Sequence, residues 1–415
     1  MSSAKSSYKV AIVAPTCFYY QTDLFRELAV HPRIDLTVYF CSNEGLSARD
    51  VLEMYKVHQH WGDEHLLEGY RSKFLTNYAP QPSYLKWPFG LINFGILKEI
   101  ILGRPDVVIL MSWMNPTWWI ALAASVMFRI PFFYMTDANV QIEPLRSKWK
   151  RRIKQFFLGK ILFKLSSGFL CAGTANHHFY RLYGVPEKKL FPFAYSWGYE
   201  SMLKKSVELT PQRNQIRAEL GFSEEELVIL YCGRLSAEKN LFNLIEAYHR
   251  LDCQKKALVF VGDGNLREPL QILVDKLGAH SVHFLGFKDR NQIGKYYAMS
   301  DVFILPSVRE TWGIAVNEAM CFGLPVIVSQ QVGAGIDLVD DGQNGYSVGT
   351  QTENIAKGIQ QISMLSKEEI TLMGERSKST IEKWMRRDLA ELLVQYVESI
   401  QNKTPADEAS DSTLE

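Results

Sequence analysis

Cysteine is scarce in this chain and forms no metal-binding or redox motif. The 415 residues include six cysteines, and no two of them are spaced as Cys-x-x-Cys. Most lie within apolar runs, which is typical of reduced, buried thiols in the cytosol and not of a disulfide framework. The apolar run near the N-terminus is also too short for a signal peptide. We therefore expect a cytoplasmic protein.

An excess of charge of either sign is also lacking. Lysine and arginine number 46, aspartate and glutamate 45, and the formal net charge is +1. A chain this close to neutrality lacks the basic surface that bulk nucleic-acid binding needs, so we predict no nucleic-acid partner. With 47% hydrophobic and 22% charged residues, the composition is typical of a globular protein. The length suits two domains.

Charge is absent altogether from Val107 to Phe128, a run long enough to span a bilayer. Polar residues interrupt its middle, however, with Asn115 and Pro116 suited to the N-cap and first position of a helix. We predict a buried strand over 107–111 and a helix over 117–128, because strands of a parallel sheet are continuous apolar runs. The first strand–helix–strand unit also lacks GxGxxG, so a nicotinamide dinucleotide site is not supported, and Thr22 is expected to cap its helix.

Acidic residues are missing from Pro144 to Pro186, where lysines and arginines are frequent. Between 147 and 165, large apolar residues recur at helical spacings among these cations. Two interpretations remain open. Residues 146–164 form a basic amphipathic helix that docks on an anionic membrane surface, or a helix whose apolar stripe packs on the sheet while its cations are solvated.

The segment Ser307–Pro325 organises the chain. It begins after the apolar run 302–306, carries Glu310 and Glu318 eight positions apart, and leads into a second apolar strand. In a strand–loop–helix–strand unit, the loop and the first helical turn border a crevice at the sheet's C-terminal edge. The N–H groups that face it, predicted at Gly313, Ile314 and Ala315, suit a phosphate or a sugar hydroxyl. For either glutamate alone, a solvated side chain is the simpler interpretation.

A second strand end carries a pair of cations. The run LVILYCGRLSAEKNL places Gly233 and Arg234 after an apolar strand and Lys239 near a helix start. Fixed cations in a crevice from which water is excluded stabilise negative charge that develops on a bound group. The strand 282–287 ends nearby at Gly286 and Phe287.

These motifs resemble those of the retaining glycosyltransferases of family 4. ETWGIAVNEAM, from Glu310, is similar to the family's E-x7-E motif, which implies that Glu310 contacts the transferred sugar and Glu318 holds the nucleotide ribose. Thr311-Trp312 stand where the commonest form has Pro-Phe, which leaves the sugar preference open. The resemblance covers about 225–350 with specific motifs and the first domain in pattern only.

The same resemblance assigns the other donor contacts. Arg234 and Lys239 match the family's G-R-L-x-x-x-K segment, whose cations clamp the donor diphosphate, with Gly233 before them. Gly286 and Phe287 match its base-contacting strand end.

In the first domain, Asp137 follows the strand 131–135 at the edge that faces the crevice. Because related enzymes hold a polar residue there, Asp137 is predicted to position the acceptor or assist as a base, with a helix N-cap or loop residue as the alternative. Tyr19 and Tyr20 either shape the acceptor pocket or pack in the core. Residues 43–90, which include His58, His60 and His65, are expected to form a mobile acceptor-side loop and no zinc site.

The expected fold is α/β: the GT-B arrangement of two Rossmann-like, doubly wound domains facing across a cleft. We predict an acceptor-binding domain over 1–198, a link over 199–225 and a nucleotide-sugar domain over 226–382. A helix over 383–401 should cross back onto the first domain. Residues 402–415 are expected to be disordered.

The resemblance implies a hexosyltransferase that moves a sugar from a nucleotide-diphosphate sugar to a glycan or lipid-linked acceptor with retention of configuration. No Asp-x-Asp triad occurs, so no divalent metal and no other cofactor are expected. No obvious covalent nucleophile is placed, which favours front-face displacement. Such an enzyme would be cytoplasmic, with peripheral attachment to the inner face of the membrane if residues 146–164 dock there. The alternatives are a non-catalytic partner subunit, a sugar-nucleotide epimerase and a phosphorylase.

Overall fold

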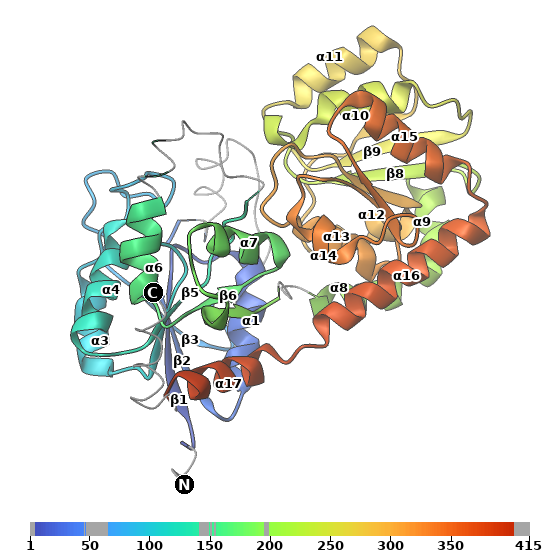
Figure 1. Ribbon diagram of the computed structural model, residues 1–415. Coiled ribbons are helices and arrows are strands. Elements are labelled where there is room, and N and C mark those ends of the chain that lie inside the picture. The colour runs from blue at the N-terminus through green and yellow to red at the C-terminus, as the bar shows by residue number, and fades with distance from the viewer. Residues whose placement is uncertain are drawn as a thin grey trace.

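The computed structural model describes residues 5–44, 46, 65–140, 149, 152, 155–194 and 199–401. Figure 1 shows two α/β halves side by side, each built on a parallel sheet flanked by helices.

The first half contains a seven-stranded sheet with the order β3-β2-β1-β4-β5-β6-β7. Its strands are β1 (Tyr8–Ala14), β2 (Ile34–Phe40), β3 (Arg71–Phe74), β4 (Val107–Leu110), β5 (Phe132–Tyr134), β6 (Gly168–Cys171) and β7 (Leu190–Pro192). The helices are α1 (Tyr19–Val30), α3 (Gly95–Gly103), α4 (Pro116–Met127), the π-helix η1 (Phe156–Leu162), α6 (Phe163–Leu165), α7 (Thr174–Leu182) and the 3-10 turn η2 (Glu187–Lys189).

The second half repeats this arrangement with six strands in the order β10-β9-β8-β11-β12-β13. The strands are β8 (Leu227–Cys232), β9 (Lys256–Val261), β10 (Val282–Phe284), β11 (Val302–Leu305), β12 (Val326–Ser329) and β13 (Gly345–Val348). Its helices are α8 (Tyr199–Leu209), η3 (Thr210–Gln212), α9 (Arg213–Glu219), η4 (Ala237–Lys239), α10 (Leu241–His249), α11 (Arg267–Leu277), α12 (Gly294–Met299), α13 (Ile314–Cys321), α14 (Gly333–Leu338), α15 (Thr352–Ser363) and α16 (Lys367–Met385). The last helix of the chain is α17 (Leu389–Gln401).

In each sheet the strand that comes first in the chain, β1 or β8, lies in the interior of the sheet. The strand order changes direction beside it. In the first half β2 and β4 lie on opposite sides of β1, and in the second β9 and β11 flank β8. Such a reversal opens a crevice at the C-terminal ends of the strands. The strands β4, β11 and β12 are buried at every residue, as their apolar runs predict for a parallel sheet covered on both faces.

The last helix crosses back to the first half, as expected. Tyr396 Oη donates a hydrogen bond to the carbonyl of Pro192 at 2.8 Å, and Tyr8 Oη donates to Glu398 at 3.2 Å. Figure 1 shows α16 running beneath the second half and α17 packed under the first. The prediction of one helix over 383–401 is wrong at its start, because α16 ends at Met385 and α17 begins at Leu389. Asp388 explains the restart, since its carboxylate accepts the Glu391 N–H at 2.8 Å as an N-cap does.

Two other expectations are settled by local structure. The uncharged run forms β4 and α4, with Asn115 at the N-cap position and Pro116 at the first helical position, as predicted. Within the ranges given above, no helix is long and apolar enough to cross a membrane. Thr22 does not cap α1, because that helix begins three residues earlier, at Tyr19.

The region 43–90 was expected to be irregular, yet Arg71–Phe74 forms the edge strand β3. Its residues alternate between exposed and half-buried, which gives the sequence no apolar run to signal a strand. His65 pairs with Glu68 at 2.8 Å on the surface, while His58 and His60 lie outside the described residues.

Candidate functional site

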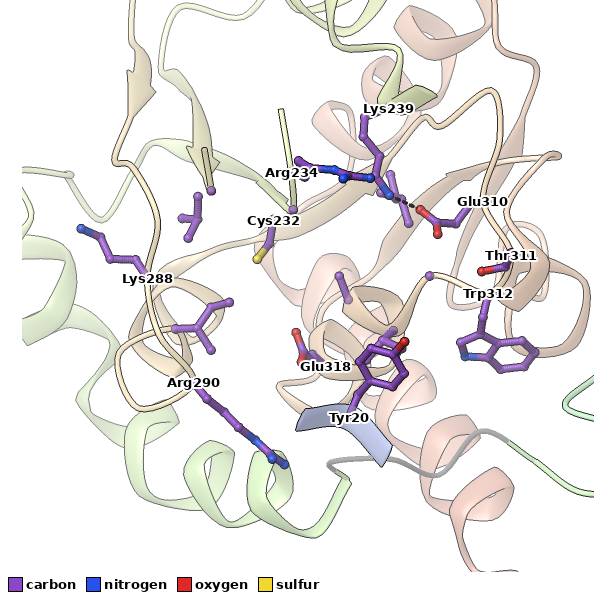
Figure 2. A pocket seen from close by; sticks show the side chains of 18 of the residues that line it. Tyr20, Cys232, Arg234, Lys239, Lys288, Arg290, Glu310, Thr311, Trp312 and Glu318 are labelled. Carbon is purple, nitrogen blue, oxygen red and sulfur yellow. Dashed lines mark hydrogen bonds and ion pairs between the residues drawn. The ribbon is translucent and has the colours of Figure 1, made fainter. Parts of the chain in front are cut away.

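A cavity of about 440 Å³ lies between the two sheets, and both halves contribute to its wall (Figure 2). Tyr20 enters from α1, and Asp137 follows β5. The second half contributes the ends of β8, β9 and β11, the segment after β10, and the first turn of α13. The predicted site residues that line this cavity are Asp137, Gly233, Arg234, Lys239, Phe287, Glu310, Gly313, Ile314, Ala315 and Glu318.

Gly286 is the exception among the predicted site residues, because it is not part of the cavity wall. Its carbonyl accepts a hydrogen bond from the N–H of Gly262 at 2.9 Å, so it ties the end of β10 to that of β9. Its role in the structure is support for the wall.

The start of α13 depends on Gly313. This residue has φ +97°, and a Cβ there would lie 3.0 Å from side-chain atoms of Leu305 and Val332. Only glycine takes this conformation without strain and fits this space. Gly313 thereby brings the first N–H groups of the helix, at Ile314 and Ala315, to the cavity, where the helix dipole favours an anion.

Two cations stand at the opposite wall, and each has a carboxylate partner. Lys239 forms an ion pair with Glu310, and both side chains are mostly buried (Figure 2). Arg234 pairs with Glu238 at 2.9 Å. Glu238 was not singled out from the sequence, although a glutamate four positions after an arginine is a local signal. The arrangement holds positive charge close to a carboxylate, which suits a ligand with both phosphate and hydroxyl groups.

The turns behind these cations are packed backbone to backbone. Gly262 has φ +135°, and a Cβ on it would lie 1.9 Å from the carbonyl oxygen of Gly233. The N–H of Gly233 in turn donates to Val261 O at 2.9 Å. Glycine at 262 therefore allows the chain before Arg234 to pass close to the end of β9.

Glu318 lies one helical turn inside α13. Its carboxylate accepts a hydrogen bond from the buried Tyr297 hydroxyl at 2.7 Å. Burial raises the pKa of Glu318, although Tyr297 and the cations Arg290 and Lys205 act in the opposite direction. The carboxylate is thus fixed on one side and open to the cavity on the other.

Two further cations line the cavity, and neither was predicted from the sequence. Lys288 and Arg290 follow β10, on the side of the cavity away from Lys239 (Figure 2). Arg290 also forms an ion pair with Asp23 of α1 at 2.7 Å, which joins the two halves. The signal was available, since basic residues directly after a parallel strand face the same crevice as Phe287.

Asp137 faces the donor-side wall from the first half. Its side chain is exposed to the cavity, whose walls come from both halves. Desolvation by the walls of the cleft raises the pKa of Asp137, and the charge of Glu310 adds to the effect, while the donor groups of its own backbone and of Thr311 act against it. A carboxylate with a raised pKa is a stronger base than a free aspartate, which suits proton transfer.

The raised pKa of Asp137 predicts a pH-dependent stability difference. Since the folded pKa lies above the unfolded value of 3.8, the stabilising protonated form dominates at lower pH and is lost as pH rises through the folded pKa. Asp137→Asn removes this loss, so its melting temperature should gain on the wild type over the pH range above about 4, the unfolded pKa of an aspartate. Thermal melts across this range measure the gain, and a difference that does not change with pH would contradict it.

Thr311-Trp312 differ from the commonest family sequence, and both contact the first half. Trp312 packs on Gly173, where a Cβ would lie 2.4 Å from the indole ring. The amide of Asn139 donates to the carbonyls of Glu310 at 3.2 Å and Thr311 at 2.6 Å. Asn139 was not predicted, and it ties the Glu310 loop to the first half.

A further pair of hydrogen bonds joins the two halves beside the cleft. Asp337 of α14 accepts the N–H of Thr174 at 2.9 Å and its hydroxyl at 2.5 Å. Gly173, at the N-cap of α7, has no side chain to accept these bonds. A carboxylate of the second half therefore caps a helix of the first. In the described ranges, no cluster of three His, Cys, Asp or Glu side chains is placed to hold a metal ion.

The family profile that matches this chain covers its second half. Residues 212–380 match the family profile described as Glycosyl transferases group 1. A glycosyltransferase of Methanocaldococcus jannaschii without assigned function is 35% identical over 154 residues, which are 36% of this chain and 39% of that protein. Alpha-monoglucosyldiacylglycerol synthase of Acholeplasma laidlawii is 31% identical over 144 residues, covering 34% of this chain and 36% of that enzyme. The matched segments span little more than a third of either relative.

The likeness of fold extends over the whole chain. The crystal structure of Anabaena HepE in complex with UDP superposes with a TM-score of 0.69 and 18% identity, covering 95% of this chain and 100% of that chain. The GT-B arrangement of two Rossmann-like domains, expected from the sequence, is therefore confirmed.

Proposed function

We propose that this chain, whose second domain belongs to the group 1 glycosyl transferases, moves a hexose from a nucleotide-diphosphate sugar to a glycan or lipid-linked acceptor. The transfer retains the anomeric configuration and needs no divalent metal or other cofactor. One observation carries the proposal. The Lys239–Glu310 pair, Arg234 and the N-terminus of α13 converge on one cavity at the C-terminal ends of the strands.

In this proposal the donor lies along the second half. Its diphosphate binds between Arg234, Lys239 and the N–H groups at the start of α13, where cations and the helix dipole replace a metal ion. Glu318, fixed by Tyr297, receives the ribose hydroxyls. The complex of HepE with UDP makes a uridine nucleotide the first donor to test.

The reaction proceeds by front-face displacement. The bond between the anomeric carbon and the diphosphate oxygen breaks, the acceptor oxygen bonds to the same face of that carbon, and the acceptor proton passes to the leaving phosphate. Glu310 orients the sugar while its own charge is held by Lys239. Asp137, directly opposite in the first half, positions the acceptor hydroxyl. The largest contribution is the fixed positive charge around the leaving diphosphate.

A panel of nucleotide sugars in buffer with EDTA tests this function. We expect slow hydrolysis of one donor by the wild type, insensitive to EDTA, and a loss on the order of 10²-fold in Glu310→Gln. Glu225→Gln is the matched control, because Glu225 is an exposed glutamate that also pairs with a lysine. No turnover of any donor, or turnover that EDTA abolishes, would contradict the proposal.

We also propose that the first half rests on an anionic membrane surface through residues 146–164. Of these, the structure describes 149, 152 and 155–164. In the described part, Leu158 and Leu162 are buried, while Phe156 is 64% and Phe157 49% exposed. Phe163 is buried and packs on Phe169 of β6, so this segment contacts the sheet through one face, while the rings of Phe156 and Phe157 remain exposed. Exposed rings among lysines, with no acidic residue from Pro144 to Pro186, suit an anionic lipid surface.

Removing these rings should weaken membrane binding alone. The variant with both Phe156→Ser and Phe157→Ser is expected to bind phosphatidylglycerol vesicles at least tenfold more weakly, because each buried ring contributes about 1.5–3 kcal/mol. Co-sedimentation measures the binding, and donor hydrolysis should be unchanged. Ile272→Ser, at an exposed apolar position of α11, serves as control. Equal binding of the double variant and the wild type would refute the docking surface.

A further inference from the structure

A second, smaller cavity of about 110 Å³ opens in the first half beside the main one. Tyr20 and Asp137 belong to the walls of both cavities. The smaller cavity lies at the C-terminal edge of the first sheet, next to the ends of β1, β4 and β5. A group held there would be adjacent to Asp137 and open toward the donor side.

The walls of this cavity are mostly apolar. They include Phe18, Met111 and Met135, and among its described lining residues no lysine, arginine or histidine occurs. Of the described residues in the lining, Asp137 alone carries a carboxylate. An anionic group would find no cation here and would face the Asp137 charge, and a free sugar would leave most of its hydroxyls against apolar atoms.

One buried polar atom in the wall lacks a partner. Gln21 is 6% exposed, and its side-chain Oε1 accepts no hydrogen bond from any of the residues that the structure describes. Buried acceptors are rarely left unsatisfied, and an explanation is a ligand that supplies the missing donor. Gln21 lines the small cavity and not the main one. A hydroxyl is the donor that an amide oxygen in an otherwise apolar wall suits best.

We infer that this small cavity receives the reacting end of the acceptor, and that the acceptor is an uncharged alcohol carried on an apolar body. The inference rests on the proposed transferase function and narrows its acceptor to a lipid alcohol. Before transfer the reacting hydroxyl of the acceptor donates a hydrogen bond to Gln21 Oε1 and lies beside Asp137, while the apolar carbons contact Phe18, Met111 and Met135. On transfer that hydroxyl loses its proton to the leaving diphosphate and bonds the anomeric carbon.

Binding of three probes tests the acceptor class. Calorimetry on the full chain would compare dioctanoylglycerol, methyl glucoside and L-malate, which represent an uncharged lipid alcohol, a free sugar and an anionic alcohol. We expect dioctanoylglycerol to bind at least tenfold more tightly than the other two. No binding of dioctanoylglycerol, or equal binding of either alternative, would overturn the inference.

Two variants locate the binding. Gln21→Leu should weaken dioctanoylglycerol at least tenfold without loss of melting temperature, because it removes an unsatisfied buried atom. Phe18→Ser should also weaken it while giving α1 a better N-cap. Gln271→Leu, on the exposed face of α11, should change nothing. Unchanged affinity in Gln21→Leu would show that the lipid binds elsewhere. Donor hydrolysis in the same preparations separates the outcomes, since its absence refutes the proposed function and its presence without lipid binding refutes only this inference.

Discussion

Replacing Lys239 with alanine is expected to lower kcat/KM for the donor by about 30- to 1000-fold, a loss of about 2–4 kcal/mol in transition-state stabilisation. Lys239 is 16% exposed and lies at the cavity wall, where a cation acts on the leaving diphosphate with little screening. Its loss also leaves the mostly buried Glu310 carboxylate without its ion-pair partner. Steady-state kinetics with saturating and limiting donor measure the effect.

The control is Lys255→Ala, which removes an exposed lysine that also pairs with a glutamate. Its kcat/KM should match the wild type, because an exposed pair contributes little. A double variant with Glu310→Gln should be less impaired than the two single effects multiplied together, since the residues are in direct contact. A Lys239→Ala enzyme with undiminished kcat/KM would remove this residue from the diphosphate site.

The second large effect is expected at a glycine. Gly262→Ala should lower the free energy of unfolding by about 3 kcal/mol or more, because the added methyl meets the Gly233 carbonyl at 1.9 Å and the residue has φ +135°. The added Cβ is bonded directly to the backbone, and the Gly233 carbonyl oxygen is a backbone atom. The clash therefore cannot be relieved by moving a flexible side chain. The shift of Gly233 would also displace Arg234, so donor affinity should fall with stability.

Gly278→Ala serves as the control that introduces backbone strain without a steric clash. Gly278 also has positive φ, +62°, but nothing lies within 4 Å of its Cβ position. Alanine there should cost only about 1 kcal/mol of backbone strain. Chemical denaturation of both variants measures the difference. Equal losses at 262 and 278 would mean that the close approach of the two turns does not constrain the site.

The parts of the site that the sequence predicted are local in the chain. Glu310, Gly313 and Glu318 lie on one loop and helix, and Arg234 and Lys239 follow one strand, so strand–loop–helix patterns were enough to bring each set to a sheet edge. Their meeting in one cavity followed from the family's fold, which the structure shares. Their roles in donor binding and catalysis stay predictions until variants are measured.

The parts that the sequence did not predict depend on contacts between distant residues. Asn139 reaches the Glu310 loop from the other half, and Asp337 caps a helix that begins at Thr174. Neither residue stands in a pattern that marks its partner. The edge strand β3 has no apolar run that would identify it in the sequence. Its pairing with β2 defines it as a strand. Such features follow from tertiary packing, which no local periodicity encodes.

The helix break near Arg386 could have been found. Asp388 precedes an apolar run and Glu391 stands three positions later, which is a start signal for a new helix. The apolar pattern of 383–401 continues through the break, and it was therefore interpreted as one helix. The break lets α16 follow the second half while α17 turns to contact β1 and α1 in the first.

The anomeric configuration of the first-formed product tests the central claim most directly. Proton NMR would follow the turnover of the donor identified in the panel, in EDTA, before the sugar can mutarotate. We expect a product with the configuration of the donor, formed at a rate that EDTA does not change. An inverted product, or turnover that appears only when a divalent cation is restored, would contradict transfer by the cations and the helix N-terminus of this cleft.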